Sequence, residues 1–234
     1  MLSRRNALFS FGALSSAAFV AKANDTQSCD VFNPKTQGAT TPDAALQLLK
    51  DGNVRFVEGK TRNCDMRKHV IATADQQSPI ATIVGCIDSR VPAEMIFDQR
   101  IGDMFSARVA GNFVNTDILG SLEFATKLAG SKLIVVLGHT SCGAIKGAVD
   151  DAKLGHLTGM LANIRPSLTK LNYTGVPSSK NKELVQKLAD QNAKDAAQKI
   201  MDKSEVIATL VKEGKVKIVS AMHDLSTGKV SFFA

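Results

Sequence analysis

Two short apolar runs in this 234-residue chain each lead directly into residues that bind metal ions well. Residues 80–85 (Ile-Ala-Thr-Ile-Val-Gly) precede Cys86, and residues 133–137 (Leu-Ile-Val-Val-Leu) precede Gly138 and His139. Apolar runs this short and rich in β-branched residues predict strands that are buried on both faces of a parallel sheet. Because open α/β sheets bind ligands beyond the carboxyl ends of their strands, we expect both motifs at one edge of the same sheet.

The rest of the chain alternates between strand and helix patterns. Further strands are predicted at residues 103–108, 217–222 and 229–233, and helices at residues 42–59, 117–129, 142–149, 157–171 and 183–212. Residues 61–77 predict turns and a short helix, and the polar residues 24–40 predict a loose arm. The alternation indicates an α/β fold with a mainly parallel central sheet, flanking helices and an N-terminal helical arm. The last two strands are close enough along the chain to form a hairpin at an edge of the sheet.

The first 23 residues have the pattern of a cleavable export signal. Arg4 and Arg5 precede an apolar stretch at residues 7–20, which ends in Ala21-Lys22-Ala23. The stretch is shorter than the ~18 residues expected of a membrane span, so no stable membrane anchor is predicted. Ser3-Arg4-Arg5 fits the twin-arginine route, and an ordinary secretory signal that happens to carry two arginines is the alternative. We therefore expect a periplasmic protein in which residues 24–234 form a single domain, with an N-terminal arm at residues 24–60.

Composition argues against a nucleic-acid-binding protein. The formal net charge is +7, but the C-terminal helices that carry most of the lysines also carry many acids, which is typical of a solvated face. Aromatic residues make up only 5%, with no Trp and one Tyr, so the chain lacks the platforms on which bases stack.

Two motifs together offer two thiolates, one imidazole and one carboxylate. Residues 86–90 (Cys-Ile-Asp-Ser-Arg) supply Cys86 and Asp88, and residues 139–142 (His-Thr-Ser-Cys) supply His139 and Cys142. This donor set suits Zn²⁺, which binds sulfur, nitrogen and oxygen tetrahedrally. Cys142 is also expected near a helix N-terminus, where the helix dipole favours a thiolate.

Two other chemistries use the same residues. Cys142 activated by His139 would make a nucleophilic hydrolase, but this leaves Cys86, Asp88 and Arg90 without a role. A purely structural zinc site would have Asp88 as a permanent fourth ligand, which leaves Arg90 unexplained.

The other two cysteines allow two interpretations. An even number of cysteines in an exported protein invites disulfides, and Cys86 and Cys142 are better used as ligands. Cys29 and Cys64 therefore either pair with each other or remain free thiols near the arm.

The two motifs resemble those of the β-class carbonic anhydrases, whose pattern is Cys-x-Asp-Ser-Arg followed by His-x-x-Cys-Gly. Further similar segments are residues 49–56, 77–79, 102–105, 108–112 and 224–230. The resemblance covers residues 42–232, which is nearly all of the chain after the predicted signal.

The resemblance implies an enzyme, a carbonate dehydratase with Zn²⁺ held by Cys86, His139 and Cys142 and water in the fourth position. Zinc would lower the pKa of that water to about 7, and the resulting hydroxide would convert carbon dioxide to bicarbonate and a proton. Because two thiolates offset the charge of the metal, an alkaline activity optimum is expected. Asp88 would either pair with Arg90 and orient the nucleophile, or move onto zinc as an alternative fourth ligand. A plain surface ion pair is the simpler interpretation of these two residues.

The same resemblance assigns the substrate site and the assembly. Gln77 would hydrogen-bond the substrate, and Phe105 and Ala110 would line its apolar pocket, although Gln77 as an ordinary loop amide and Phe105 as a core residue are alternatives. A homodimer or homotetramer is implied, with N-terminal helices wrapped around the partner. The helix at residues 42–59 would have this role, although it could equally cover its own subunit. Hydrolysis of carbonyl sulfide or carbon disulfide would use the same zinc site, and the sequence does not separate these activities.

Two departures from the family pattern narrow the prediction. Members with a second, non-catalytic bicarbonate site carry a Trp where this chain has Ile83, so that site is not expected here. His223 stands where the family commonly has Tyr. It could aid proton shuttling, but we expect a packed or surface histidine, as for His69 and His156.

Overall fold

The computed structural model describes residues 28–233, and the predicted export signal lies outside them. Within this range the sheet has the strand order β2-β1-β3-β4-β5. The strands are β1 (Ala81–Gly85), β2 (Met104–Arg108), β3 (Leu133–His139), β4 (Lys217–His223) and β5 (Val230–Phe232). Strands β2, β1, β3 and β4 are parallel, and β5 runs antiparallel to β4. The predicted α/β fold, its mainly parallel sheet and the hairpin at the edge are confirmed.

The helices differ from the predicted ones mainly at their boundaries. They are α1 (Pro34–Ala39), α2 (Pro42–Val57), α3 (Met66–Ala72), α4 (Ala93–Ile96), α5 (Thr116–Glu123), α6 (Gly143–Val149), α7 (Gly155–Leu161), α8 (Arg165–Lys170), α9 (Lys182–Lys203) and α10 (Glu205–Lys212), with a π-helical turn η1 (Phe124–Leu128) after α5. The predicted helix at residues 183–212 is split at Ser204, whose side chain accepts a hydrogen bond from the Ile207 N–H and so begins α10. The short α4 was not predicted, and residues 157–171 form two short helices.

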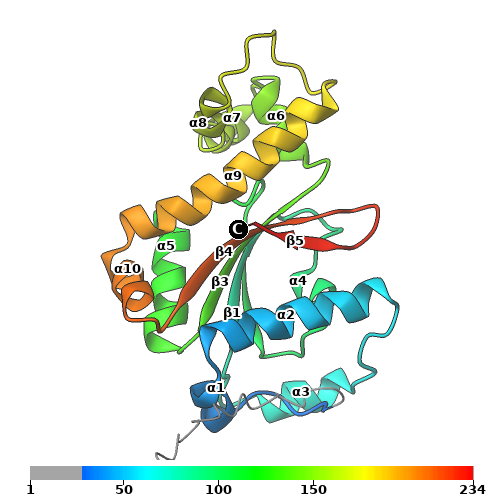
Figure 1. Cartoon of the computed structure of the whole chain (residues 1–234), viewed down its shortest axis with the longest axis vertical. Helices are drawn as coiled ribbons and strands as arrows, with labels where there is room; N and C mark the ends of the chain where they lie inside the picture. Colours follow the sequence, from blue (N-terminus) through cyan, green and yellow to red (C-terminus); the bar gives the residue numbers. More distant parts are fainter. Residues whose placement is uncertain (1–27, 234) are drawn as a thin grey trace, which may run out of the picture.

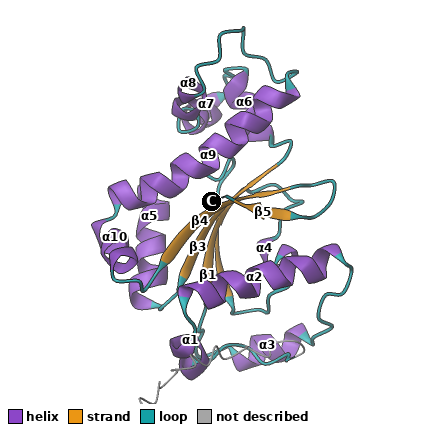
Figure 2. Ribbon diagram, in the orientation of Figure 1, coloured by secondary structure: helices purple, strands orange, loops and turns teal. Residues whose placement is uncertain are grey.

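The helices form layers on both faces of the sheet (Figure 1). Helix α2 crosses one face, where Ala45 and Leu49 are fully buried against a core that includes Ile83 and Val135. On the other face, α5, the C-terminal half of α9 and α10 pack against Val84 and the even-numbered residues of β3. Figure 2 shows α6, α7 and α8 grouped beside the N-terminal half of α9, beyond the carboxyl ends of the strands. Strands β1 and β3 are buried along their whole length, as their composition predicted.

The predicted loose arm at residues 24–40 is wrong for the part that the structure describes. Asn33 caps α1 by accepting hydrogen bonds from Lys35 N and Thr36 N. Gln37 then donates from Nε2 to the carbonyls of Pro79 at 2.7 Å and Ala129 at 2.8 Å. The arm is ordered because these long-range contacts, which a local pattern does not reveal, hold it against the amino ends of the strands.

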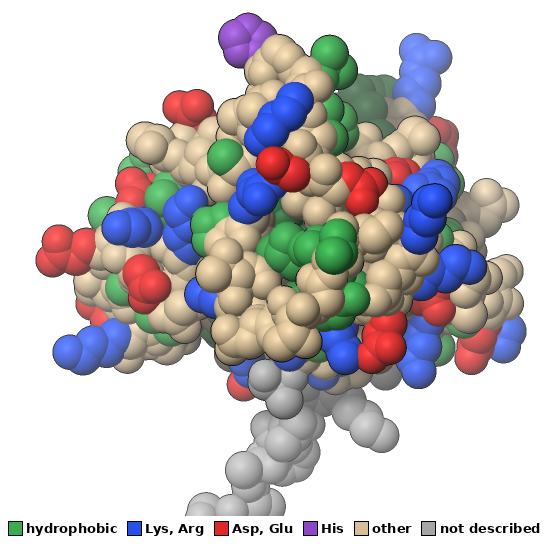
Figure 3. Space-filling view, turned by 90° about the horizontal axis from the view of Figure 1, so that it is seen from above, with side chains coloured by type: hydrophobic (Ala, Val, Ile, Leu, Met, Phe, Trp, Pro, Cys, Tyr) green, Lys and Arg blue, Asp and Glu red, His purple; other side chains and the backbone are tan. Residues whose placement is uncertain are grey.

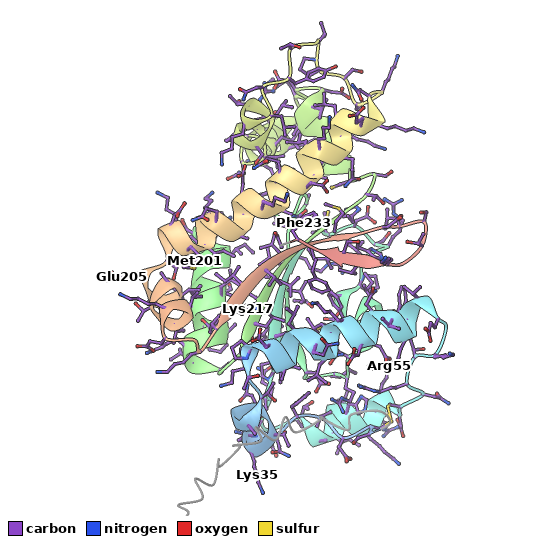
Figure 4. All side chains as sticks on the ribbon, viewed as in Figure 1. Lys35, Arg55, Met201, Glu205, Lys217 and Phe233 are labelled. Atoms are coloured by element: carbon purple, nitrogen blue, oxygen red, sulfur yellow. A yellow bond between two sulfur atoms is a disulfide. The ribbon has the colours of Figure 1, made fainter. Side chains whose placement is uncertain are left out.

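A disulfide closes the arm onto α3 and decides between the two interpretations of Cys29 and Cys64. These cysteines are bonded, with their Cα atoms 5.6 Å apart (Figure 4). His69, which is 5% exposed, donates from Nε2 to the Cys29 carbonyl at 3.0 Å. Arg100 and Asp103 form a buried ion pair at 2.6 Å. Arg100 also contacts the arm, because it donates to the Ser28 carbonyl at 3.1 Å.

No helix within residues 28–233 combines the length and the apolar character needed to cross a membrane. On the face seen in Figure 3, basic and acidic side chains are interspersed, as expected of a solvated surface.

Candidate metal centre

Three side chains with metal-binding atoms converge at the carboxyl edge of the sheet. The ligand atoms of Cys86, His139 and Cys142 all lie within 4.8 Å of one another, and the three residues are 4%, 1% and 1% exposed. The two sulfur atoms are 3.9 Å apart, close to the ~3.8 Å that a tetrahedral zinc with Zn–S bonds of about 2.3 Å requires. The predicted ligands are therefore brought together with spacing that suits Zn²⁺.

The local backbone explains how two segments meet. Cys86 directly follows β1, whereas His139 is the last residue of β3 rather than a residue beyond it. Ser141, between the two residues, has a left-handed backbone with φ of 58°, and Cys142 lies within ligand distance of His139 and Cys86. Cys142 occupies the N-cap position of α6, where the positive end of the helix favours a thiolate.

The imidazole of His139 is set up to bind a metal through Nε2. Its Nδ1 lies 3.0 Å from the Thr140 carbonyl, which only accepts hydrogen bonds, so Nδ1 carries the ring proton. Its Nε2 is buried and has no hydrogen-bond partner among the described residues. A buried lone pair facing two thiols fits a metal ligand, and the Nδ1 contact fixes the tautomer that a ligand needs.

The two thiols share one proton when no cation is present. A hydrogen bond from Cys142 lowers the pKa of Cys86 to about 4, although burial works against this. The same hydrogen bond, together with burial, raises the pKa of Cys142 well above its ordinary value. Two adjacent thiolates are stable only beside a positive charge, so a divalent cation would displace the shared proton.

The sequence left two arrangements open for Asp88, on the metal or paired with Arg90. The structure shows Asp88 paired with Arg90. Arg90 donates from Nε to Oδ1 at 2.9 Å and from Nη2 to Oδ2 at 2.7 Å, and its backbone N–H also donates to Oδ1. These hydrogen bonds hold the pKa of Asp88 well below its usual range. Asp88 Oδ2 is nevertheless only 3.8 Å from His139 Nε2, so the carboxylate stands beside the three ligands while Arg90 binds it.

Two further side chains support the centre and were missed in the sequence. Arg108, at the carboxyl end of β2, donates to the carbonyls of Cys86 at 2.8 Å and Asp88 at 2.6 Å. Asn192, from α9, donates to the carbonyl of Gly111, whose own N–H donates to Cys86 Sγ. Arg108 could have been found as a charged residue that ends a strand at this edge of the sheet. Asn192 could have been found as a polar residue on the buried face of a helix.

The predicted substrate residues do not all reach this centre within one chain. Ala110 adjoins Gly111 and so lies next to Cys86. Gln77 is exposed and precedes β1, whereas Cys86 follows it, so the length of β1, about 16 Å, separates the two. Phe105 lies near the start of β2, where its ring packs against Phe124 with centroids 6.1 Å apart.

His223 is a packed histidine beside the centre, as expected. It pairs in register with His139 on the neighbouring strand and is 3% exposed. Neither of its ring nitrogens has a hydrogen-bond partner in the described part of the chain. Burial, followed by the nearby His139, lowers its pKa, which favours the neutral form of the ring.

Comparison with known proteins agrees with this geometry. Residues 81–230 match the protein family described as carbonic anhydrase. The chain is 35% identical over 196 residues to carbonic anhydrase 2 of Mycobacterium tuberculosis. The matched region covers 81% of this chain and 92% of that protein. It is also 35% identical over 197 residues to a carbonic anhydrase of Mycolicibacterium smegmatis, and that match covers 82% of this chain and 93% of the relative.

The fold comparison leads to the same family. A tetrameric β-carbonic anhydrase of the ascomycete Sordaria macrospora superposes with a TM-score of 0.63 at 25% sequence identity, over 71% of this chain and 87% of that chain. Because family match, sequence identity and fold agree over most of the chain, this protein is an enzyme that belongs to the β-class carbonic anhydrase family.

Proposed function

We propose that this enzyme catalyses the reversible hydration of carbon dioxide to bicarbonate and a proton, with Zn²⁺ held by Cys86, His139 and Cys142. The observation that carries the proposal is the carboxylate of Asp88, which stands beside the three ligand atoms but is bound by Arg90. A structural zinc site would use that carboxylate as its fourth ligand, whereas an enzyme needs the fourth position open. The carbonic anhydrases of the two mycobacteria support the same activity.

Zn²⁺ bound here would act as a Lewis acid that makes water nucleophilic near neutral pH. Asp88 remains ionised throughout that pH range because Arg90 lowers its pKa. An ionised carboxylate only accepts hydrogen bonds, so it can orient an entering water by accepting one of its protons. Arg90 holds the acceptor in place through two parallel hydrogen bonds, and burial of His139 and both cysteines keeps bulk water from their ligand atoms.

We propose in addition that a second copy of the chain completes the substrate site. Gln77 precedes β1 and Phe105 lies near the start of β2, so both are too far from the carboxyl ends of these strands to serve the centre of their own chain. Strand β2 forms an edge of the sheet, and beside it Phe124 and Leu128 are 52% and 76% exposed. An open edge flanked by exposed apolar side chains favours association, and the Sordaria macrospora relative is described as tetrameric.

A complementation experiment tests this assembly. Gln77→Ala and His139→Ala variants should each be nearly inactive alone. If Gln77 acts on the centre of a partner, mixed oligomers regain activity, because half of their sites combine an intact centre with an intact Gln77. Light scattering should show at least a dimer. A monomer by light scattering, or mixed oligomers with no recovered activity, would refute shared sites.

We also propose that the protein is exported to the periplasm. The pattern of residues 1–23 supports this, and so does the disulfide between Cys29 and Cys64, because disulfides persist in oxidising compartments. N-terminal sequencing of protein from the periplasmic fraction should give a chain that begins near Asn24. Recovery of the full-length chain from the cytoplasm alone would contradict export.

The activity itself is tested by stopped-flow hydration of carbon dioxide with the zinc-loaded enzyme. We expect rapid turnover that rises from pH 6 to pH 9, since two thiolates make the bound metal a weaker acid. Carbonyl sulfide and carbon disulfide should be measured with the same preparation. Faster turnover of either gas than of carbon dioxide would overturn the proposed substrate, and a flat rate over this pH range would contradict the expected optimum.

A further inference from the structure

Gly111 makes one hydrogen bond to a predicted metal ligand and another to a side chain of helix α9. Its N–H donates to Cys86 Sγ at 3.3 Å, and its carbonyl accepts a hydrogen bond from Asn192 Nδ2 at 2.8 Å. Asn192 lies 81 residues away in the sequence, on α9, and is only 2% exposed. Through Gly111, the buried amide of Asn192 connects helix α9 to the predicted metal ligand Cys86.

The backbone at Gly111 needs outside support to keep its orientation. Its φ of 85° is accessible mainly to glycine, and a Cβ there would stand 2.5 Å from Ile164 Cδ1. Lys199, two turns after Asn192 on the same face of α9, donates to the Val114 carbonyl at 2.8 Å. Helix α9 therefore holds the segment after β2 at two points, and Asn192 is the one next to the centre.

We infer that Asn192 is a positioning residue that holds Gly111 so that its N–H donates to the Cys86 thiolate. A hydrogen bond to a thiolate stabilises the sulfur lone pairs and weakens their donation to a metal, and it fixes the direction of the sulfur. Without Asn192 the peptide unit after Gly111 loses its anchor, so the N–H of Gly111, in the preceding peptide unit, is no longer held toward the sulfur. The sulfur then becomes a stronger and less well oriented donor. The inference rests on the proposed function only in that Cys86 is a metal ligand.

The test uses the full-length mature chain loaded with Co²⁺, which reports the state of the sulfur ligands through the sulfur-to-cobalt charge-transfer band. Asn192→Asp keeps the side-chain volume but replaces the donor by an acceptor, and Asn192→Ala removes the group. In both variants we expect the band to move to longer wavelength, because the sulfur donates more strongly. We expect the affinity for Co²⁺ to fall about 10–100-fold, because the lost orientation of the sulfur outweighs its stronger donation. The Kd is measured by competition with a coloured chelator.

Asn53 provides a matched control. It is a buried amide on α2, 4% exposed, whose Nδ2 also donates to backbone carbonyls, those of Ile96 at 3.1 Å and Gly228 at 2.9 Å. Asn53→Ala and Asn53→Asp should lower the unfolding temperature as much as the Asn192 changes do. They should leave the charge-transfer band and the metal affinity unchanged.

The outcomes separate this inference from the proposed function. An unmoved band and an unchanged Kd in Asn192→Asp would overturn the inference, even if wild-type enzyme hydrates carbon dioxide. A band that moves only in the Asn192 variants supports it, even if wild-type enzyme proves inactive on carbon dioxide. A band that moves equally in the Asn53 variants would show a general loss of packing and would also overturn it.

Discussion

Asp88 and Arg90 meet side by side, with Arg90 Nε 2.9 Å from Oδ1 and Nη2 2.7 Å from Oδ2. Arg90 is 55% exposed at its side chain and Asp88 only 14%, so the arginine binds the outer side of a carboxylate that faces the centre. An exposed ion pair elsewhere would contribute about 0–1 kcal/mol, but we propose that here the pair also determines whether Asp88 reaches the metal.

Arg90→Ala should therefore abolish most of the activity. The freed carboxylate is close enough to occupy the fourth metal position, and we expect kcat/KM to fall at least about 100-fold. Zinc content should stay near one ion per chain, because the three ligands are untouched. Arg165→Ala is the control, since Arg165 pairs with Asp151 on the surface, and full activity in Arg90→Ala would reject the role.

Metal removal should inactivate the enzyme reversibly. Dialysis against a strong chelator at mildly acidic pH should remove zinc, because protons compete for the two thiolates, and added Zn²⁺ should restore activity. Cys142→Ser should retain little metal under the same conditions, as measured by elemental analysis. Unchanged activity in protein shown to be free of metal would exclude the zinc mechanism.

The disulfide should stabilise the fold without taking part in the reaction. It joins cysteines 35 residues apart, and a loop of that size is worth about 3–4 kcal/mol in the unfolding free energy. The double variant Cys29→Ser with Cys64→Ser should lose that amount in urea denaturation. Wild-type protein treated with a reductant should match it, and equal stability of all three samples would contradict the expectation.

Gly111→Ala should destabilise the protein by about 1–3 kcal/mol, since it places a Cβ on a left-handed backbone and against Ile164. Gly120→Ala is the matched control, because Gly120 lies on α5 and a Cβ at this position would have no neighbouring atom within 4 Å. That change should raise stability by about 0.5–1 kcal/mol, as expected for alanine in a helix. Thermal and urea unfolding of both variants provide the measurement.

Stability should fall at acidic pH partly through Asp195. Burial alone would raise its pKa, but hydrogen bonds from Lys170, Ser167 and Gln191 outweigh burial and leave the pKa lowered. A lowered pKa in the folded state means that the carboxylate stabilises the fold above its unfolded pKa of about 3.9 and loses this effect as the pH falls through the folded value.

Asp195→Asn should thus cost about 1–2 kcal/mol at pH 7 and much less near pH 2. Urea unfolding of wild type and variant at the two pH values measures the difference. A cost that is the same at both would show that the charge of Asp195 does not matter.

Local patterns explain why much of the fold could be predicted. The strands β1 and β3 were visible because an apolar, β-branched run has few other uses, and Thr41 and Pro42 marked the start of α2. The ligand residues were visible because their motifs follow strands directly. Export from the cytoplasm remains a prediction, since residues 1–23 lie outside the described part of the chain.

The sequence by itself determined the strands of the sheet, the two motifs at its carboxyl edge and the family, because each is recognised from residues close together along the chain. Only the tertiary structure decided that Cys29 bonds to Cys64, that Gln37 orders the arm, that Gln77 lies at the opposite end of β1 from Cys86, and that Asn192 reaches Gly111. These relationships join segments from 35 to 92 residues apart or depend on the direction of a strand. Such contacts form only when packing brings the segments together, so no local periodicity records them.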